Sequence, residues 1–185
     1  MLRRINGIGM LWNRPSDAWL GIQGLKSEQR NRAFGALLQQ GRIAEVNVQG
    51  LAHPLYMAAE NLGQLHAAMD ASLSDGCARI LAPLDNLLWD RRLVSELFGF
   101  DYKWEVYTPA PERKYGYYVL PVLHGSRLIG RIEMETDAKT STLIVKNIWF
   151  EPERDVASTR KSIVLGIERF ATYNRCGHLD IRCAM

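Results

Sequence analysis

Apolar residues near the start of the chain recur at helical spacing. Residues 28–40 carry their apolar side chains on one face of a helix, and Gly41 stands where a helix commonly ends. Ser27 is placed to act as the N-cap of this helix. A shorter helix, broken by two glycines, is expected just before it over residues 15–27. The first forty residues therefore predict two consecutive helices.

The spacing changes to that of strands between residues 43 and 58. Residues 43–48 alternate apolar and polar side chains, Gln49-Gly50 offers a tight turn, and residues 55–58 can return as the partner strand. Helix, helix and hairpin is the element order of a winged helix. Arg30 and Arg32, on the predicted polar side of the second helix, are then candidates for DNA contact. Solvated charges on a purely structural winged helix would give the same pattern.

Two further helices and a short strand are predicted before residue 100. The third helix covers residues 59–73 and is followed by an acidic turn at Asp75-Gly76. A short apolar strand is expected at 78–84, and residues 87–98 form a helix that stops at Gly99.

The period of the pattern changes to two from residue 102 onwards. Leu128, Ile132 and Met134 share one face of a strand, so one side of the sheet is expected to be buried and the other mostly wet. A helix over about 156–174 can cover the buried side. The predicted strands are residues 102–107, 115–123, 127–136, 141–150 and 178–182, with a hairpin turn at His124-Gly125-Ser126.

Together these elements predict an α+β fold, with an N-terminal winged helix followed by an antiparallel β-rich lobe that a long C-terminal helix covers. The boundary is expected between residues 75 and 88, where a helical half gives way to a sheet-rich half. We accordingly divide the chain into 1–75, the winged-helix unit with its connecting helix, and 76–185, the β-rich lobe with the long helix.

Composition places the chain among ordinary globular proteins. It is 47% hydrophobic and 23% charged, with a net charge of +3, so disorder is not indicated. The excess of Lys and Arg in the first sixty residues favours that part as a nucleic-acid surface. No apolar run approaches the roughly 20 residues of a membrane span, and three cysteines without a CxxC pair are typical of free thiols in a reducing compartment. The sequence therefore predicts a soluble, cytoplasmic protein with no membrane partner.

Several chemistries have no support in the sequence. Phosphate-binding glycine loops and a GxSxG nucleophile are absent, and Asp85 and Asp90 do not obviously converge as an acid–base pair. The histidines and cysteines lack zinc-ligand spacing, and their one cluster, Cys176, His178 and Cys183, is a poor metal site. No metal and no cofactor is predicted.

The stretch ILAPLDNLLWDRRL, residues 80–93, places five strongly polar residues among bulky apolar ones. Burying a polar group without a hydrogen bond costs about 1–3 kcal/mol, so these groups need partners. Asp85 and Asn86 are natural caps for the helix that follows. Asp85 and Asp90 are also expected to form ion pairs with Arg91 or Arg92.

The same stretch belongs to a longer resemblance. The DN-x-x-WDR block, FGFDY, WEVYTPAPERKYGYYVLPVL and the LIGR strand resemble, nearly without gaps, the YcaQ/AlkZ family of winged-helix crosslink-repair DNA glycosylases. The earlier segment DAWLGIQGLKSEQRNRAFGALLQQGRIAEVNVQG is similar to the last winged-helix unit of that family. The resemblance covers nearly the whole chain.

The resemblance implies tandem winged helices with a C-terminal β-rich lobe, and cleavage of the N-glycosidic bond of alkylated or crosslinked bases. The family's catalytic motif is Gln-x-Gln or Gln-x-Asp near its N-terminus. Gln23 in GIQGL imitates that motif, but it lies in the later winged-helix segment and lacks the second polar partner. We therefore assign no catalytic residue. We expect the chain to be the DNA-binding C-terminal portion of such an enzyme, without its catalytic N-terminal segment.

Duplex DNA, damaged or crosslinked, is the expected partner, and Lys, Arg and backbone N–H groups would grip its phosphates. The candidates lie on the second helix, on the ERKYGY loop and on the hairpin. The resemblance implies that a projecting hairpin of this kind takes part in crosslink processing. The predicted nucleic-acid-binding residues are Arg30, Arg32, Arg113, Lys114, Tyr115, His124 and Arg127. The residues predicted to fix the junction between the lobes are Asp85, Asn86, Trp89, Asp90 and Arg91.

Two alternatives stay open. The chain could be a stand-alone nucleic-acid-binding winged-helix protein without catalysis. The order of its last elements is also similar to an N-acetyltransferase, which needs a glycine-containing loop for the pyrophosphate of acetyl-CoA. Residues 151–164 contain no glycine, and Glu153 and Asp155 would repel a dianion, so this alternative is the weaker one. The sequence gives no oligomeric state.

Overall fold

The computed structural model describes residues 1–71, 77–152 and 156–184. Its contacts divide the chain into two compact units, Met1–Ser72 with Leu84–Asp101, and Leu73–Pro83 with Tyr102–Met185. The sequence analysis places a single boundary at residue 75 and so assigns 84–101 to the second part, whereas the contacts assign this segment to the first unit. The predicted acidic turn at Asp75-Gly76 lies outside the described residues.

The first unit combines helices with a three-stranded antiparallel sheet in which β3 is central, between β1 and β2. The hairpin predicted over residues 43–58 is confirmed as strands β2 and β3. The elements are α1 (Leu2–Ile8), β1 (Leu11–Trp12), η1 (Asp17–Trp19), α2 (Ser27–Gln39), β2 (Ile43–Val46), β3 (Leu55–Ala58), η2 (Ala59–Asn61), α3 (Leu62–Asp70), η3 (Asn86–Leu88) and α4 (Arg91–Phe98).

Large apolar side chains fix α2 and α4 to this sheet. Phe34 of α2 meets Trp19 and Tyr56 edge-on, with ring centroids 5.7 Å and 4.9 Å away. Leu93 of α4 belongs to the same core as Trp12. Burial of a side chain of this size contributes about 1.5–3 kcal/mol, so α4 is an integral part of the first unit. The helix α2 begins with Lys26 as its N-cap, without a side-chain hydrogen bond, so the prediction of Ser27 as the cap is wrong.

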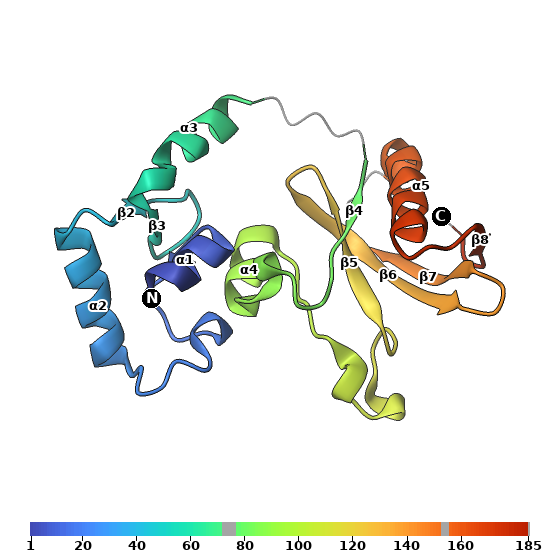
Figure 1. Ribbon diagram of the computed structural model, residues 1–185, viewed down its shortest axis with the longest axis horizontal. Helices are drawn as coiled ribbons and strands as arrows, with labels where there is room; N and C mark the ends of the chain where they lie inside the picture. The colour runs from blue at the N-terminus through green and yellow to red at the C-terminus, as the bar shows by residue number, and fades with distance from the viewer. Residues whose placement is uncertain (72–76, 153–155, 185) are drawn as a thin grey trace. The chain divides into compact units, whose positions relative to one another are not determined.

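The second unit is a five-stranded sheet in the order β4-β5-β6-β7-β8 with one long helix, α5 (Figure 1). Strands β4 to β7 pair antiparallel, but β8 runs parallel to β7 because α5 connects the two as a crossover. The predicted antiparallel lobe is thus a mixed sheet. The elements are β4 (Arg79–Ile80), η4 (Glu105–Tyr107), η5 (Ala110–Glu112), β5 (Val119–His124), β6 (Arg127–Asp137), β7 (Thr142–Phe150), α5 (Val156–Tyr173) and β8 (His178–Ile181).

A β-bulge changes which side chains of β6 enter the core. Val122 pairs with Gly130 and Leu123 pairs with Leu128, so Ile129 has no partner on β5. The unpaired residue shifts the alternation by one. Ile129 therefore joins Ile132 in the core cluster to which Ile163 and Ile167 of α5 also belong. The sequence pattern predicts Leu128 at this position in the core instead.

The other side of β6 is also covered, although the alternation predicts a wet face. Leu128 is fully buried, and Arg131 is only 4% exposed. Residues 102–107, predicted as a strand, contain the short 3-10 helix η4 instead. Among the described residues, no helix is long and apolar enough to cross a membrane.

Gly166 allows α5 to approach β4 closely, since an added Cβ would collide with the carbonyl oxygen of Ala78. We expect Gly166→Ala to lower the free energy of unfolding by about 1–3 kcal/mol, although alanine is the better helix former by about 1 kcal/mol. Gly35→Ala on α2 is the control, because nothing lies within 4 Å of its added Cβ; it should stabilise by up to about 1 kcal/mol. Urea denaturation measures both. A Gly166→Ala variant as stable as the wild type would contradict the close approach.

Candidate nucleic-acid interface

The polar residues of the 80–93 stretch find their partners within the first unit. Asp85 caps η3 by accepting a hydrogen bond from the Leu87 N–H at 2.9 Å. Asn86 donates from Nδ2 to the carbonyl oxygen of Gly7 at 2.7 Å, so it ties η3 to α1 rather than capping a helix. Arg92 pairs with Glu96 at 3.3 Å, one turn further along α4, and not with Asp85 or Asp90 as predicted.

Asp90 has the most buried carboxylate of this stretch, with 1% of the residue exposed. Its Oδ1 accepts from the Leu93 N–H at 3.0 Å, which caps α4, and its Oδ2 accepts from Trp12 Nε1 at 2.7 Å. Trp12 is fully buried. The bond between Asp90 and Trp12 therefore joins α4 to β1 inside the core.

Trp89 and Arg91 complete the residues predicted to fix a junction between lobes. Trp89 donates from Nε1 to the carbonyl oxygen of Leu84 at 3.0 Å, and the guanidinium of Arg4 lies 5.2 Å from its ring. Arg91 is exposed at the start of α4. The contacts of Asn86 with Gly7, of Trp89 with Arg4 and of Asp90 with Trp12 hold the 84–101 segment to the remainder of the first unit. The contact of Asp85 with Leu87 lies within the segment.

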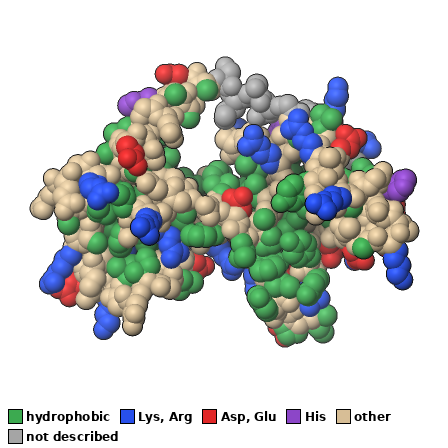
Figure 2. Space-filling view, viewed as in Figure 1, with side chains coloured by type: hydrophobic (Ala, Val, Ile, Leu, Met, Phe, Trp, Pro, Cys, Tyr) green, Lys and Arg blue, Asp and Glu red, His purple; other side chains and the backbone are tan. Residues whose placement is uncertain are grey.

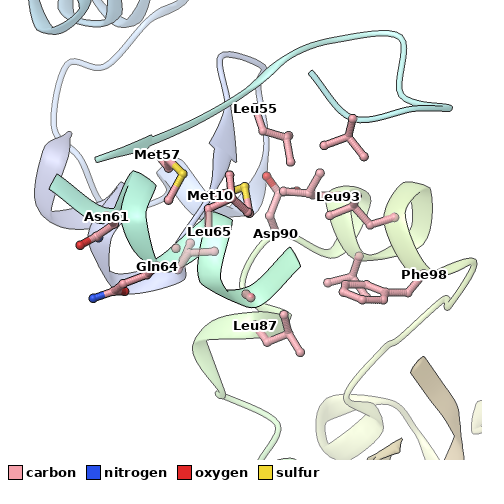
Figure 3. Close-up of a pocket in the computed structure, with 16 residues that line it drawn as sticks. Met10, Leu55, Met57, Asn61, Gln64, Leu65, Leu87, Asp90, Leu93 and Phe98 are labelled. Carbon is pink, nitrogen blue, oxygen red and sulfur yellow. The ribbon is translucent and has the colours of Figure 1, made fainter. Parts of the chain in front are cut away.

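An apolar pocket of about 600 Å³ lies beside Asp90 in the first unit (Figure 3). Asn61 and Gln64 are polar residues on its wall, and Asp90 is the one titratable group among its described lining residues. Both oxygens of this carboxylate already accept hydrogen bonds, from the Leu93 N–H and from Trp12 Nε1. The pocket thus offers an apolar binding volume. Its apolar lining includes Met10, Leu55, Met57, Leu65, Leu93 and Phe98.

The two arginines predicted on α2 have different environments. Arg32 is exposed and pairs with Glu28 at 2.5 Å, one turn earlier. Arg30 precedes Phe34 by one turn and so lies on the buried face. It is 6% exposed, its Nε donates to Asn13 Oδ1 at 2.9 Å, and burial lowers its pKa. The interpretation of Arg30 as a solvent-facing cation is therefore wrong, because this side chain anchors α2 to the loop after β1.

The ERKYGY loop is organised by Glu105, which is 6% exposed. Its Oε1 accepts from the Lys114 N–H at 2.9 Å, and its Oε2 accepts from Tyr115 N–H at 2.9 Å and Gly116 N–H at 3.3 Å. Burial raises the pKa of Glu105, but the three backbone hydrogen bonds and the charge of Lys103 together outweigh burial, so the pKa is lowered. The sequence pattern does not reveal this role of Glu105, because the alternation of residues 102–107 predicts a strand.

The predicted side chains of this loop lie on aromatic rings. Arg113 donates from Nε to the carbonyl oxygen of Thr108 at 2.8 Å, and its guanidinium lies 4.9 Å from the ring of Tyr117. Lys114 is exposed with its Nζ 5.0 Å from the Tyr115 ring. Tyr115 itself is half-buried, with the Arg131 guanidinium 4.2 Å from its ring. Lys114 is therefore the exposed cation of the loop, Arg113 is half-buried, and Tyr115 packs against Trp149 of the sheet.

The hairpin between β5 and β6 turns at Gly125, whose φ is +57°. His124 and Arg127 face each other in register across the turn. His124 Nε2 lies 3.2 Å from Ser162 Oγ, so the end of β5 contacts α5. Arg127 is exposed.

Two further cations lie near this hairpin. Arg79 of β4 pairs with Leu123, next to His124, and Lys161 of α5 precedes Ser162. Both side chains are exposed, and Figure 2 shows basic side chains on this part of the second unit. The sequence analysis names neither residue, because strand pairing and helix packing bring them to the hairpin from distant parts of the chain.

The described residues contain no group of three or more His, Cys, Asp or Glu side chains that could hold a metal ion. Cys77, Cys176 and Cys183 are free thiols. The family model described as "DNA glycosylase AlkZ-like" matches residues 2–173 of the chain. No solved structure matches the chain significantly.

Proposed function

We propose that this chain, which belongs to the AlkZ-like DNA glycosylase family, binds duplex DNA as the C-terminal portion of a repair enzyme for alkylated or crosslinked bases. The family match over residues 2–173 carries the proposal. Base hydrolysis would depend on a Gln-x-Gln or Gln-x-Asp motif that these residues do not contain. The cytoplasm is the proposed location.

The first unit supports this proposal as a winged helix. Its elements run α1, β1, α2, β2, β3, and its sheet has the order β1-β3-β2. In that arrangement α2 is the helix that would approach a DNA groove. Arg32 on α2 is the proposed phosphate contact, while Arg30 holds the helix in place.

The second unit would grip the backbone through its loop and its hairpin. Arg113 and Lys114 are the proposed contacts on the loop, and His124 and Arg127 are those on the hairpin. Lys114 and Arg127 are exposed, and exposed cations in a loop or turn can approach phosphates without distortion of the sheet. Asn86, Trp89 and Asp90 would keep the 84–101 segment in place while DNA is bound, and Asp85 would cap η3 within that segment.

Salt dependence of binding tests the proposal. We expect a labelled duplex of about 20 base pairs to bind with an affinity that falls steeply between about 50 and 200 mM salt. Arg127→Ala should weaken binding and lower the slope of log K against log[salt] by about 0.9, the contribution of one phosphate contact. Lys139→Ala, an exposed cation on the β6–β7 turn, should change neither. Absence of salt-sensitive binding at micromolar protein would refute the proposal.

Base release separates a catalytic chain from one that only binds DNA. The purified chain should release no base from an alkylated duplex. The same result is expected for a DNA-binding portion of an enzyme and for a stand-alone nucleic-acid-binding protein. Base release that is abolished by substitution of one side chain of this chain would contradict the proposal that the catalytic motif is absent from it. For the acetyltransferase alternative, Glu153 and Asp155 lie outside the described residues, and calorimetric titration with acetyl-CoA is the direct check.

A further inference from the structure

Aromatic side chains gather on the surface of the second unit between residues 104 and 118. The Trp104 ring meets Tyr107 and Tyr118 edge-on, with centroid distances of 5.9 Å and 6.2 Å. Tyr107 is 89% exposed, Tyr117 54% and Tyr118 41%. Figure 2 shows hydrophobic side chains clustered over this part of the unit, where Figure 1 places the short helices before β5. Contiguous exposed apolar surface of this kind marks an interaction site.

The backbone beneath these rings is fixed by buried hydrogen bonds. Glu105 binds three consecutive N–H groups at 114–116. The Arg113 side chain binds the carbonyl oxygen of Thr108, and the Tyr102 hydroxyl donates to the carbonyl oxygen of Val119 at 2.9 Å. The exposed tyrosines therefore project from a rigid loop. Rigid aromatic residues lose little conformational entropy when they bind a ligand.

The segment that carries the rings has one more cation than acids. Between residues 102 and 118 the cations are Lys103, Arg113 and Lys114, and the acids are Glu105 and Glu112. Glu105 is buried, which leaves Glu112 as the exposed acid in this segment. Aromatic rings beside cations suit nucleic acid, because bases stack on the rings while the cations neutralise the phosphates.

We propose that Trp104, Tyr107, Tyr117 and Tyr118 form an aromatic platform on which an unpaired DNA base stacks, with Arg113 and Lys114 at the adjoining phosphates. The inference rests on the proposed DNA-binding function and adds a specificity to it. A paired base presents only its edge in a groove, whereas an extruded or unpaired base presents the face that a ring can cover. The platform should therefore favour DNA that contains unpaired bases.

Two DNA molecules test the platform: a fully paired duplex, and the same duplex with an unpaired 2-aminopurine nucleotide in a bulge. We expect tighter binding to the bulged DNA, with quenching of 2-aminopurine fluorescence as the base stacks. Tyr107→Ala should weaken binding to bulged DNA about tenfold, within the range of one lost stacking contact. Binding to the paired duplex should not change. Tyr107→Phe keeps the ring and should retain tight binding.

Tyr173→Ala is the matched control, because Tyr173 is 85% exposed at the end of α5. It should leave binding to both DNA molecules unchanged. Equal binding to both DNA molecules, unaltered by Tyr107→Ala, would overturn the platform and leave the DNA-binding proposal intact. Failure to bind either DNA would overturn both. Binding of a proline-rich peptide that Tyr107→Ala abolishes, with bulge affinity unaltered, would assign the rings to a protein partner and overturn the inference.

Discussion

Asp90→Ala is expected to lower the free energy of unfolding of the first unit by about 3–5 kcal/mol, a large share of the stability of such a unit. The carboxylate is buried and accepts from Trp12 Nε1 and from the Leu93 N–H. Its loss would leave two buried donors unsatisfied at about 1–3 kcal/mol each, and one of them is the Leu93 N–H through which Asp90 caps α4. Urea denaturation followed by tryptophan fluorescence measures the change.

Two further variants show whether the bond itself is responsible. Asp85→Ala removes a half-buried cap of η3 with one hydrogen bond and should cost about 1 kcal/mol. Trp12→Phe removes the indole donor, and combined with Asp90→Ala it should give a double-mutant coupling of at least about 1 kcal/mol. Additive effects would contradict the bond. An Asp90→Ala variant of wild-type stability that no longer binds DNA would instead place Asp90 at the DNA contact.

Helices and hairpins with several periods of pattern could be predicted from the sequence. The helix over 28–40 corresponds to α2 (Ser27–Gln39), and the hairpin over 43–58 corresponds to β2 and β3. The apolar spacing of the helix repeats often enough to exclude the strand period of two, and that of the hairpin repeats often enough to exclude the helical period of about 3.6. The apolar spacing does not determine the terminal residues of a helix. The N-cap of α2 is Lys26, which makes no side-chain hydrogen bond, instead of the predicted Ser27.

Features set by tertiary contact could not be predicted in this way. The bulge at Ile129 depends on the register with β5, and the parallel direction of β8 depends on how α5 packs. The alternation of residues 102–107 imitates a strand, but Glu105 uses its carboxylate to bind the 114–116 backbone instead. A pattern of side chains does not reveal which backbone groups lack partners.

The candidate contact residues follow the same division. Lys114 and Arg127 are exposed, as their positions in a loop and a turn predict, and their contact with DNA stays a prediction. The prediction that Arg30 faces solvent is wrong. Its position four residues before Phe34 indicates that both side chains lie on the same, buried face of the helix. Arg79 and Lys161 approach the hairpin through β4 pairing and α5 packing, which no local pattern contains.

Glu105→Gln is expected to destabilise the second unit by about 2–4 kcal/mol at pH 7, because hydrogen bonds to a charged acceptor contribute about 1.5–3 kcal/mol each. Glutamine has one carbonyl oxygen, and its amide group would face a backbone N–H that needs an acceptor. The platform tyrosines above this loop should then become more mobile.

The pH dependence gives the sharper test, because the pKa of Glu105 is lowered in the folded chain. Burial raises this pKa, and the backbone hydrogen bonds together with the charge of Lys103 lower it by more. Its stabilisation is therefore complete above the unfolded pKa of about 4.3, and it is lost as the pH falls through the lowered folded pKa. The difference between wild type and Glu105→Gln should shrink over that acid range, as urea denaturation at several pH values would show. Glu112→Gln, at an exposed position of η5, should match the wild type throughout. A Glu105→Gln deficit that stays constant down to about pH 3 would mean that shape, and not the charge on the carboxylate, holds the loop.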